Sequence, residues 1–176
     1  MSGDLKIRAE QPTDHEAIST VVSLAFQRED EARLIAELRK LPSFDPALSL
    51  VAIAGGQLIG HILFTEIVVR QRGGTTLPAM ALAPVAVRPE RQRSGIGSRL
   101  VTEGLDACRR RGDRLVIVVG HAEYYPRFGF RPARDRGLEA PFPVSDASFM
   151  LCELTPPAGA AALSDMVEYP APFQGV

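Results

Sequence analysis

The first third of the chain changes from alternating to helical hydrophobic spacing. Residues 5–9 alternate and predict a short strand. Pro12, Thr13 and Glu16 have the spacing of a helix start with a capping box, before an apolar stripe of Ile18, Val21, Val22 and Ala25. A second helix is predicted within EDEARLIAELRKL, and Pro42 ends it because proline cannot continue a helix.

The next segment predicts an antiparallel meander over residues 48–87. LSLVAIA and QLIGHILFTEIVV are apolar runs rich in β-branched residues, and Gly55-Gly56 between them suits a two-residue hairpin turn. Gly73-Gly74 then precedes a third run, TTLPAMALAPVAV. The pattern therefore predicts three strands joined by tight turns.

After residue 87 the hydrophobic period becomes helical again. Arg109, Arg110 and Arg111 followed by Gly112 are favourable chemistry for the end of this helix. RLVIVVG then predicts a buried strand, and SFMLCEL predicts another. TPPAGAA reads as a linker to a tail, VEYPAPFQGV, which we expect to pack irregularly because its two prolines exclude a central strand or helix.

These elements predict one α/β (α+β) domain with a mostly antiparallel central sheet flanked by helices. The chain has 176 residues, enough for one sizeable core. We expect the domain to span residues 1–156 and a C-terminal tail, residues 157–176, to pack on it.

Composition excludes several classes of protein. The hydrophobic fraction of 45% and the charged fraction of 23% are ordinary globular values. A net charge of -1 gives no reason to expect a nucleic-acid or membrane partner. The chain has only two cysteines, begins without a signal-like apolar run and contains no long apolar stretch. These features predict a cytoplasmic protein.

The segment VAVRPERQRSGIGSRLV has the chemistry of an anion site. A strand ends near Val87, a basic loop follows, and a helix begins near Gly95, where unpaired N–H groups and the helix dipole favour a phosphate. Gly95 and Gly97 let phosphate oxygens approach the backbone. The available arginines are Arg88, Arg91, Arg93 and Arg99.

On glycine spacing alone, a capped surface helix with solvated arginines remains an equal alternative. A dinucleotide fingerprint is excluded because there is no GxGxxG and the preceding segments are predicted hairpins. A Walker loop is excluded because no GK[ST] follows the glycines.

Two motifs together resemble the GCN5-related N-acetyltransferase (GNAT) family, in particular a bacterial subgroup of predicted acetyltransferases. The run from Gln92 to Gly97 resembles the family's acyl-CoA-binding motif, and YYPRFGF resembles its late signature, with Tyr125, Gly129 and Phe130. The motifs occur in the family's order with a strand between them, and the resemblance covers roughly residues 5–154.

The resemblance implies acetyl-CoA as cosubstrate and a pair of splayed parallel strands, Ala83–Val87 and Leu115–Val119, at its site. A backbone N–H of Val85 or Ala86 would then bond the thioester carbonyl, as in an oxyanion hole. The residues expected to bind acetyl-CoA are Val85, Ala86, Val87, Gln92, Arg93, Ser94, Gly95, Ile96, Gly97, Ser98, Tyr125 and Phe128.

The implied reaction is direct transfer of an acetyl group to a primary amine of a small molecule or protein. Tyr125 matches the family's general acid, since a phenol remains protonated at neutral pH. Its neighbour Tyr124 reads as a structural aromatic, and without the resemblance either tyrosine would be read so. The alternative function is a non-catalytic acyl-CoA-binding sensor, because MALAPVAV lacks the acid that the family often carries there.

The general base stays open among three residues. Glu66 lies on the preceding strand, and His121 and Glu123 follow the next one; each also reads as an ordinary solvated residue. The acids at positions 29–31 are either helix-start charges or groups that attract the amine.

The remaining reactive side chains are expected to have structural roles and to take no part in the reaction. Cys108 and Cys152 read as core residues. The three histidines are too scattered for a metal site, and we expect no metal. We expect a monomer or a homodimer, with an amine as the substrate partner.

Overall fold

The computed structural model describes residues 4–155 and 165–176, so the predicted linker lies outside the described residues apart from Thr155. Its strands are β1 (Lys6–Ala9), β2 (Ser49–Ala54), β3 (Gln57–Gln71), β4 (Thr76–Val87), β5 (Leu115–Val119), β6 (Arg131–Pro132), β7 (Leu138–Glu139), β8 (Phe149–Glu153) and β9 (Asp165–Glu168). Its α-helices are α1 (His15–Phe26), α2 (Asp30–Leu38) and α3 (Ile96–Arg111). Single 3-10 turns are η1 (Pro12–Asp14), η2 (Pro46–Leu48), η3 (Pro89–Arg91), η4 (Tyr125–Phe128), η5 (Ala133–Arg136) and η6 (Ala171–Gly175).

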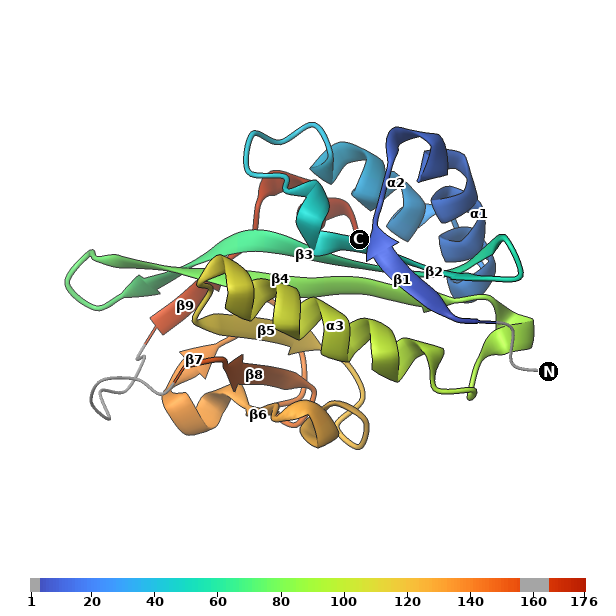
Figure 1. Ribbon diagram of the computed structural model, residues 1–176. Helices are drawn as coiled ribbons and strands as arrows, with labels where there is room; N and C mark the ends of the chain where they lie inside the picture. The colour runs from blue at the N-terminus through green and yellow to red at the C-terminus, as the bar shows by residue number, and fades with distance from the viewer. Residues whose placement is uncertain (1–3, 156–164) are drawn as a thin grey trace. The chain divides into compact units, whose positions relative to one another are not determined.

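The strands form one mixed sheet in which hydrogen-bonded neighbours follow the order β1-β2-β3-β4-β5-β8-β6, and β9 pairs with β3 and β7 (Figure 1). The β4–β5 pair is parallel, with Met80 opposite Val116 and Ala81 opposite Ile117. The predicted mixed, mostly antiparallel α/β fold with one parallel pair is therefore confirmed.

The chain divides into two compact units. The first comprises residues 1–65, 83–107 and 171–176, and the second comprises residues 66–82 and 108–170. Strands β3 and β4 and helix α3 each contribute residues to both units.

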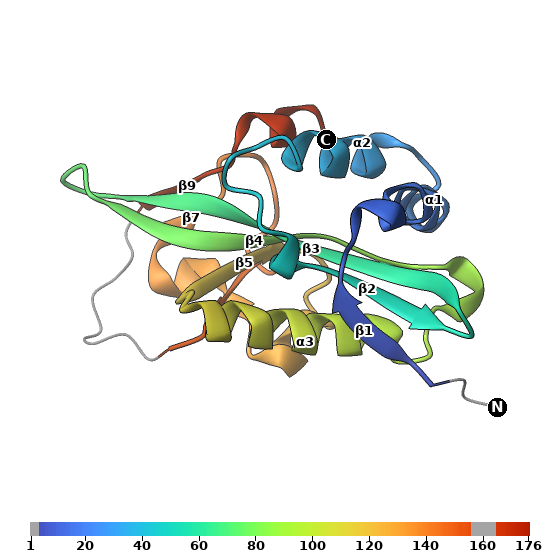
Figure 2. The same cartoon turned by 45° about the horizontal axis from the view of Figure 1, so that its top comes forward.

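In the first unit, helices cover both faces of β3 (Figure 2). On one face, α1 and α2 bury Ile18, Val22 and Ile35 against Val51 and Leu63. On the other face, α3 approaches so closely that a Cβ on Gly104 would lie 2.2 Å from the Phe64 ring. The glycine therefore sets how near α3 can lie to the strand.

A β-bulge lets β3 bury apolar residues on the α1–α2 face along its length. Ala52 pairs with Gly60 whereas Ile53 pairs with Leu58, so Ile59 is the extra residue. With this additional residue, the side chains on the two sides of the bulge exchange the faces of the sheet to which they would otherwise point. Leu58 and Leu63 consequently join the same core cluster despite their odd separation.

The start of α1 and the tail differ from expectation. The capping contact forms two residues earlier than predicted, where the Gln11 N–H donates to Asp14 Oδ2 at 2.7 Å and Arg8 pairs with the same carboxylate. Asp14 can accept both because it lies at the end of η1.

The expectation of an irregular tail is wrong for Val167 and Glu168, which belong to β9. These residues precede the tail's prolines, so every backbone N–H needed for pairing is present. In the second unit, β9 covers the end of β3, with Val69 opposite Val167 and an exposed Arg70–Glu168 ion pair.

Candidate functional site

In the first unit, the loop before α3 has the backbone geometry of an anion cradle. Arg93 and Gly95 both have positive φ angles, 59° and 84°. The Gly95 carbonyl accepts from the Arg99 N–H at 3.0 Å, which makes Gly95 the N-cap residue directly before α3. The N–H groups of Ile96 and Gly97 thus belong to a first helical turn that offers no intrahelical acceptors.

The space beside the cradle is open, and cations surround it. A Cβ built on Gly95 would meet no atom within 4 Å. Arg88 is held by Glu90 at 2.7 Å. By contrast, Arg91, Arg93 and Arg99 are exposed and make no ion pair with any residue that the structure describes. These features fit a bound pyrophosphate.

Side chains of the loop hold its shape. The Gln92 amide donates to the Val87 carbonyl at 3.1 Å, and Ser94 donates its hydroxyl proton to the Arg91 carbonyl. Gln92 therefore anchors the loop to the end of β4, a positioning role that the motif resemblance did not specify. Ile96 turns into the core and is 7% exposed.

At the end of β4, buried and half-buried residues alternate. Ala86 is 3% exposed and packs in the cluster beneath α1 and α2, whereas Val85 and Val87 are half-buried. The Arg88 N–H donates to the Ile59 carbonyl at 2.9 Å, so β4 remains fixed to β3 up to the start of the loop.

In the second unit, Tyr125 opens η4 after β5 and is 6% exposed. Its ring makes edge contacts with Tyr124 and Phe130, with centroids 5.1 Å and 5.6 Å apart, and a tilted contact with Phe128 at 6.5 Å. Burial, with a smaller contribution from Tyr124, raises the pKa of Tyr125 to about 12. The phenol consequently stays protonated at neutral pH.

Two glycines fit the backbone around Tyr125. Gly129, at a φ of 94°, ends η4 and belongs to the predicted signature. Gly120 was not predicted as functional, yet a Cβ there would lie 2.3 Å from Tyr125 Cε2. The glycine at the end of RLVIVVG was the available signal, because glycine after a strand often marks close approach of another group.

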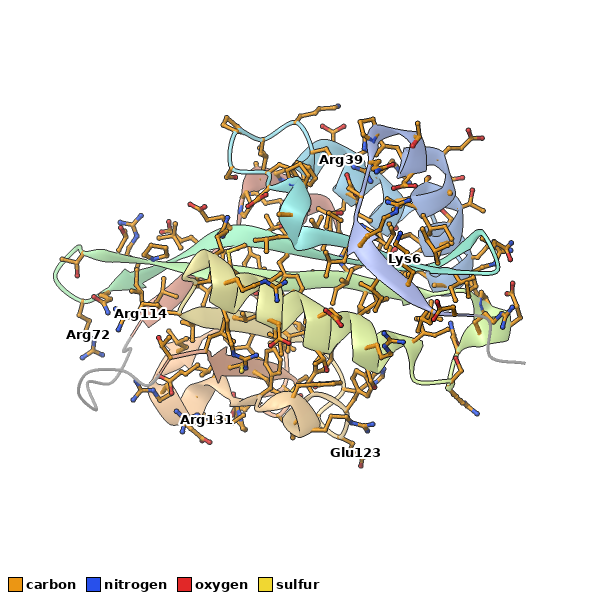
Figure 3. The ribbon with its side chains drawn as sticks, viewed as in Figure 1. Lys6, Arg39, Arg72, Arg114, Glu123 and Arg131 are labelled. Carbon is orange, nitrogen blue, oxygen red and sulfur yellow. The ribbon has the colours of Figure 1, made fainter. Side chains whose placement is uncertain are left out.

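The three candidate bases all lie in the second unit and are exposed. Glu66 is the exposed position between buried residues of β3. His121 uses its backbone carbonyl to accept from the Tyr124 N–H at 3.1 Å. Glu123 extends outward from the segment after β5 (Figure 3).

The acids before α2 are not equivalent. Glu31 is 5% exposed, and Arg28 binds its carboxylate through two nitrogen atoms. Asp30 pairs with Arg33 at 2.9 Å. The Glu31 charge is thus already compensated, whereas the exposed Glu29 carboxylate makes no ion pair or hydrogen bond with the described side chains.

A buried polar cluster in the first unit was missed because its members are far apart in the sequence. Glu10 accepts two bonds from Arg39, at 2.8 Å and 3.0 Å, and one from the Ser49 hydroxyl. His61 Nε2 lies 2.8 Å from Ser49 Oγ. Ser49 gives its only proton to Glu10, so His61 Nε2 is the donor of this bond.

His61 is unsuited to act as a base. The ring is 0% exposed and its Nδ1 atom has no hydrogen-bond partner among the described residues. Burial lowers the pKa of His61, although Glu10 opposes the shift. Figure 3 labels Arg39, which directly follows α2.

A groove of about 470 Å³ runs between α1 and α2 and is lined by His15, Ile18, Ile35 and Arg39 among others. Both cysteines are buried, which confirms them as core residues. Residues 4–155 and 165–176 contain no group of three potential metal ligands and no helix that meets the length and apolarity of a bilayer span.

An open helix N-terminus with exposed cations beside it is an arrangement with which proteins bind the phosphate groups of a ligand. The family profile described as an acetyltransferase (GNAT) domain matches residues 6–133. The chain is 43% identical over 148 residues to the uncharacterized N-acetyltransferase YjhQ of Escherichia coli (strain K12), covering 81% of each chain. It therefore belongs to the GNAT acetyltransferase family, for which acetyl-CoA is the cosubstrate.

Solved structures agree with this assignment. The GNAT family N-acetyltransferase YhbS from Escherichia coli in complex with CoA has a TM-score of 0.85 and 30% identity, covering 97% of this chain and 92% of that one. A GNAT family acetyltransferase from Brucella melitensis in complex with acetyl-CoA has a TM-score of 0.76 and 32% identity, covering 96% and 97%. The predicted fold, enzyme class and cosubstrate are confirmed.

Proposed function

We propose that this acetyltransferase transfers the acetyl group of acetyl-CoA directly to a primary amine of a small molecule or protein. The observation that carries this proposal is the open cradle at Gly95, where the first turn of α3 has unpaired N–H groups and Arg91, Arg93 and Arg99 are exposed nearby in the sequence. We place the protein in the cytoplasm as a monomer or homodimer, with no nucleic-acid or membrane partner.

In this proposal, residues 92–98 hold the pyrophosphate of acetyl-CoA. The N–H groups of the first turn of α3 donate to its oxygens, and Arg93 and Arg99 add charge-assisted bonds. Gln92 keeps the loop tied to β4 through the Val87 carbonyl. Neighbouring Val85, Ala86 and Val87 are assigned to the pantetheine arm, and an N–H of Val85 or Ala86 stabilises negative charge on the thioester oxygen.

We assign the general acid to Tyr125 and a cofactor contact to Phe128. The amine nitrogen attacks the thioester carbonyl, a C–N bond forms, the C–S bond breaks, and the sulfur takes a proton from Tyr125. The base that takes the proton from the nitrogen returns it through water to Tyr125, so no phenolate accumulates. We assign proton removal from the amine to Glu66 or His121, directly or through water.

The alternative function is a sensor that binds acyl-CoA without turnover. It is favoured by one observation, the absence of an acid from the β4 segment MALAPVAV. Binding of acetyl-CoA is common to both functions, whereas only the enzyme releases CoA faster when an amine is added.

The first test is calorimetric titration of acetyl-CoA into the protein and a Gly97→Glu variant, which places a bulky anion in the cradle. Binding by the parent that is lost in Gly97→Glu supports the cradle. A Gly175→Glu control keeps binding, since a Cβ at Gly175 meets no atom within 4 Å. Absence of parent binding, or equal binding by Gly97→Glu, contradicts the proposal.

Measuring acetyl transfer distinguishes an enzyme from a sensor that only binds acyl-CoA. Tyr125→Phe removes only the hydroxyl, so kcat falls about 100-fold or more if Tyr125 is the general acid. Acetyl-CoA affinity remains within a small factor of the parent. A Tyr125→Phe variant as fast as the parent eliminates the acid role.

A further inference from the structure

The groove of about 470 Å³ between α1 and α2 lies wholly in the first unit and has the volume of a small-molecule site. Ile18 and Ile35 line it and are 0% and 1% exposed, so they form its apolar floor. Ala32 and Ala36, one turn apart on α2, line it with small side chains that leave room for a ligand. None of the residues that line the groove has been assigned to acetyl-CoA or to proton transfer.

Both helices bring charged residues to the same end of this groove. His15 Nε2 lies 3.2 Å and Arg39 Nε 2.8 Å from one oxygen of Glu10, Oε1, so the beginning of α1 is beside the end of α2. Glu16 follows His15, Lys40 follows Arg39, and both line the groove. Charges of both signs therefore lie at one end, and the apolar part extends from there along the two helices.

The charged groups at this end retain bonding capacity for a ligand. Arg39 uses Nε and Nη2 on Glu10, so its Nη1 group makes no hydrogen bond with a described residue. Lys40 pairs with Glu37 in an exposed ion pair, which a ligand carboxylate can replace at little cost. The exposed Glu16 carboxylate makes no ion pair with a described residue. The groove thus offers donors to a carboxylate and an acceptor to an ammonium group.

We infer that this groove binds an α-amino acid with an apolar side chain. The ammonium group of the amino acid pairs with Glu16, and its carboxylate accepts from Arg39 Nη1 and Lys40. Its side chain packs on Ile35 and Ala36. A ligand of a single charge would leave either the acid or the cations of the groove uncompensated, so their combination favours a zwitterion. The inference goes beyond the proposed function because it uses none of the residues assigned to acetyl transfer.

The first test is calorimetric titration of L-leucine and of two analogues that each lack one of its charges, 4-methylpentanoate and 3-methylbutylamine. We expect leucine to bind the parent and each analogue to bind about tenfold or more weakly, because each lacks a charge-assisted bond. An analogue that binds as tightly as leucine overturns the inference. A parent that binds none of leucine, isoleucine, methionine and phenylalanine also overturns it.

Variants of the lining residues place the binding in the groove. Ala36→Leu fills its apolar part and is expected to weaken leucine binding about tenfold or more. The matched control is Ala17→Leu, since Ala17 is also an exposed helical alanine but does not line the groove. Glu16→Gln is expected to weaken leucine binding about tenfold and to leave binding of 4-methylpentanoate undiminished. Unchanged leucine binding in Glu16→Gln, or equal loss in Ala36→Leu and Ala17→Leu, overturns the inference.

The same titrations separate this inference from the proposed function. Gly97→Glu is expected to bind leucine as the parent does, because Gly97 does not line the groove. Absence of acetyl-CoA binding contradicts the proposed function and leaves the leucine result standing. Leucine is itself a primary amine, so it could bind as an acceptor of the acetyl group. Leucine binding that is unchanged in Ala36→Leu would place it outside the groove and overturn the inference, whether or not leucine is acetylated.

Discussion

Replacing Arg39 with methionine tests the energetic role of the buried cluster in the first unit. The Glu10 side chain is 2% exposed and that of Arg39 14% exposed, and two hydrogen bonds of 2.8 Å and 3.0 Å join them. Arg39→Met keeps much of the apolar stem but leaves the carboxylate buried without its main cation.

Removal of one partner of a buried ion pair costs about 3–5 kcal/mol. The Ser49 hydroxyl still donates to Glu10, and His15 lies 3.2 Å away on the accessible side. Because these donors persist, we expect the unfolding free energy to fall by about 3 kcal/mol, the lower end of that range.

The assay is urea unfolding followed by far-UV circular dichroism at neutral pH. The control is Lys40→Met on the same segment, since Lys40 and its partner Glu37 are 69% and 55% exposed. An exposed pair contributes less than about 1 kcal/mol. If Arg39→Met destabilises the protein no more than Lys40→Met does, the assigned role of the buried pair is wrong.

The pH dependence provides a second readout of the same pair. Burial raises the pKa of Glu10, but bonds from His61, Arg39 and Ser49 outweigh it and hold the pKa well below its usual range. A carboxylate with a depressed folded pKa stabilises the fold above its unfolded pKa of about 4.3 and loses that contribution as pH falls. The parent's unfolding free energy is therefore expected to decline below about pH 5, and the decline in Arg39→Met to be smaller, because the folded pKa of Glu10 is less depressed without Arg39.

Three further predictions concern packing and protonation. Gly104→Ala places a methyl group 2.2 Å from Phe64 and is expected to lower the unfolding free energy by about 1–3 kcal/mol in a urea titration. The control, Gly175→Ala, is expected to change the unfolding free energy little in the same titration. Gly120→Ala meets Tyr125 Cε2 at 2.3 Å, so kcat is expected to fall about tenfold or more by displacement of the phenol while acetyl-CoA affinity, measured by calorimetry, is retained. Because the pKa of Tyr125 is raised to about 12, the plot of kcat against pH should show no fall caused by Tyr125 ionisation below about pH 10. A fall in that range that is absent from Tyr125→Phe would contradict the raised pKa.

Local patterns in the sequence predicted most elements and their ends. Pro42 follows α2 closely, Gly55-Gly56 joins β2 to β3, and Gly112 ends α3 with a φ of 94°. These signals work because proline lacks an amide proton and glycine tolerates positive φ wherever the residue stands. The cradle was predictable for the same reason, since its donors are backbone groups fixed by a loop and a helix start.

These local patterns could not predict contacts between segments that are distant in the sequence. The bulge at Ile59 depends on the register between β2 and β3, and β9 depends on a free edge of β3 that no local signal in the tail reveals. The cluster around Glu10 joins residues from β1, α2, β2 and β3 that have ordinary local surroundings.

The sequence by itself determined the order of elements, the anion-binding loop and the tyrosine signature, because each depends on the conformational and hydrogen-bonding properties of neighbouring residues. Only the tertiary structure decided that Gly120 admits the Tyr125 ring and that Arg39 neutralises Glu10. Burial, pKa and close approach are set by whichever side chains the fold brings together, and spacing along the chain does not encode those distances.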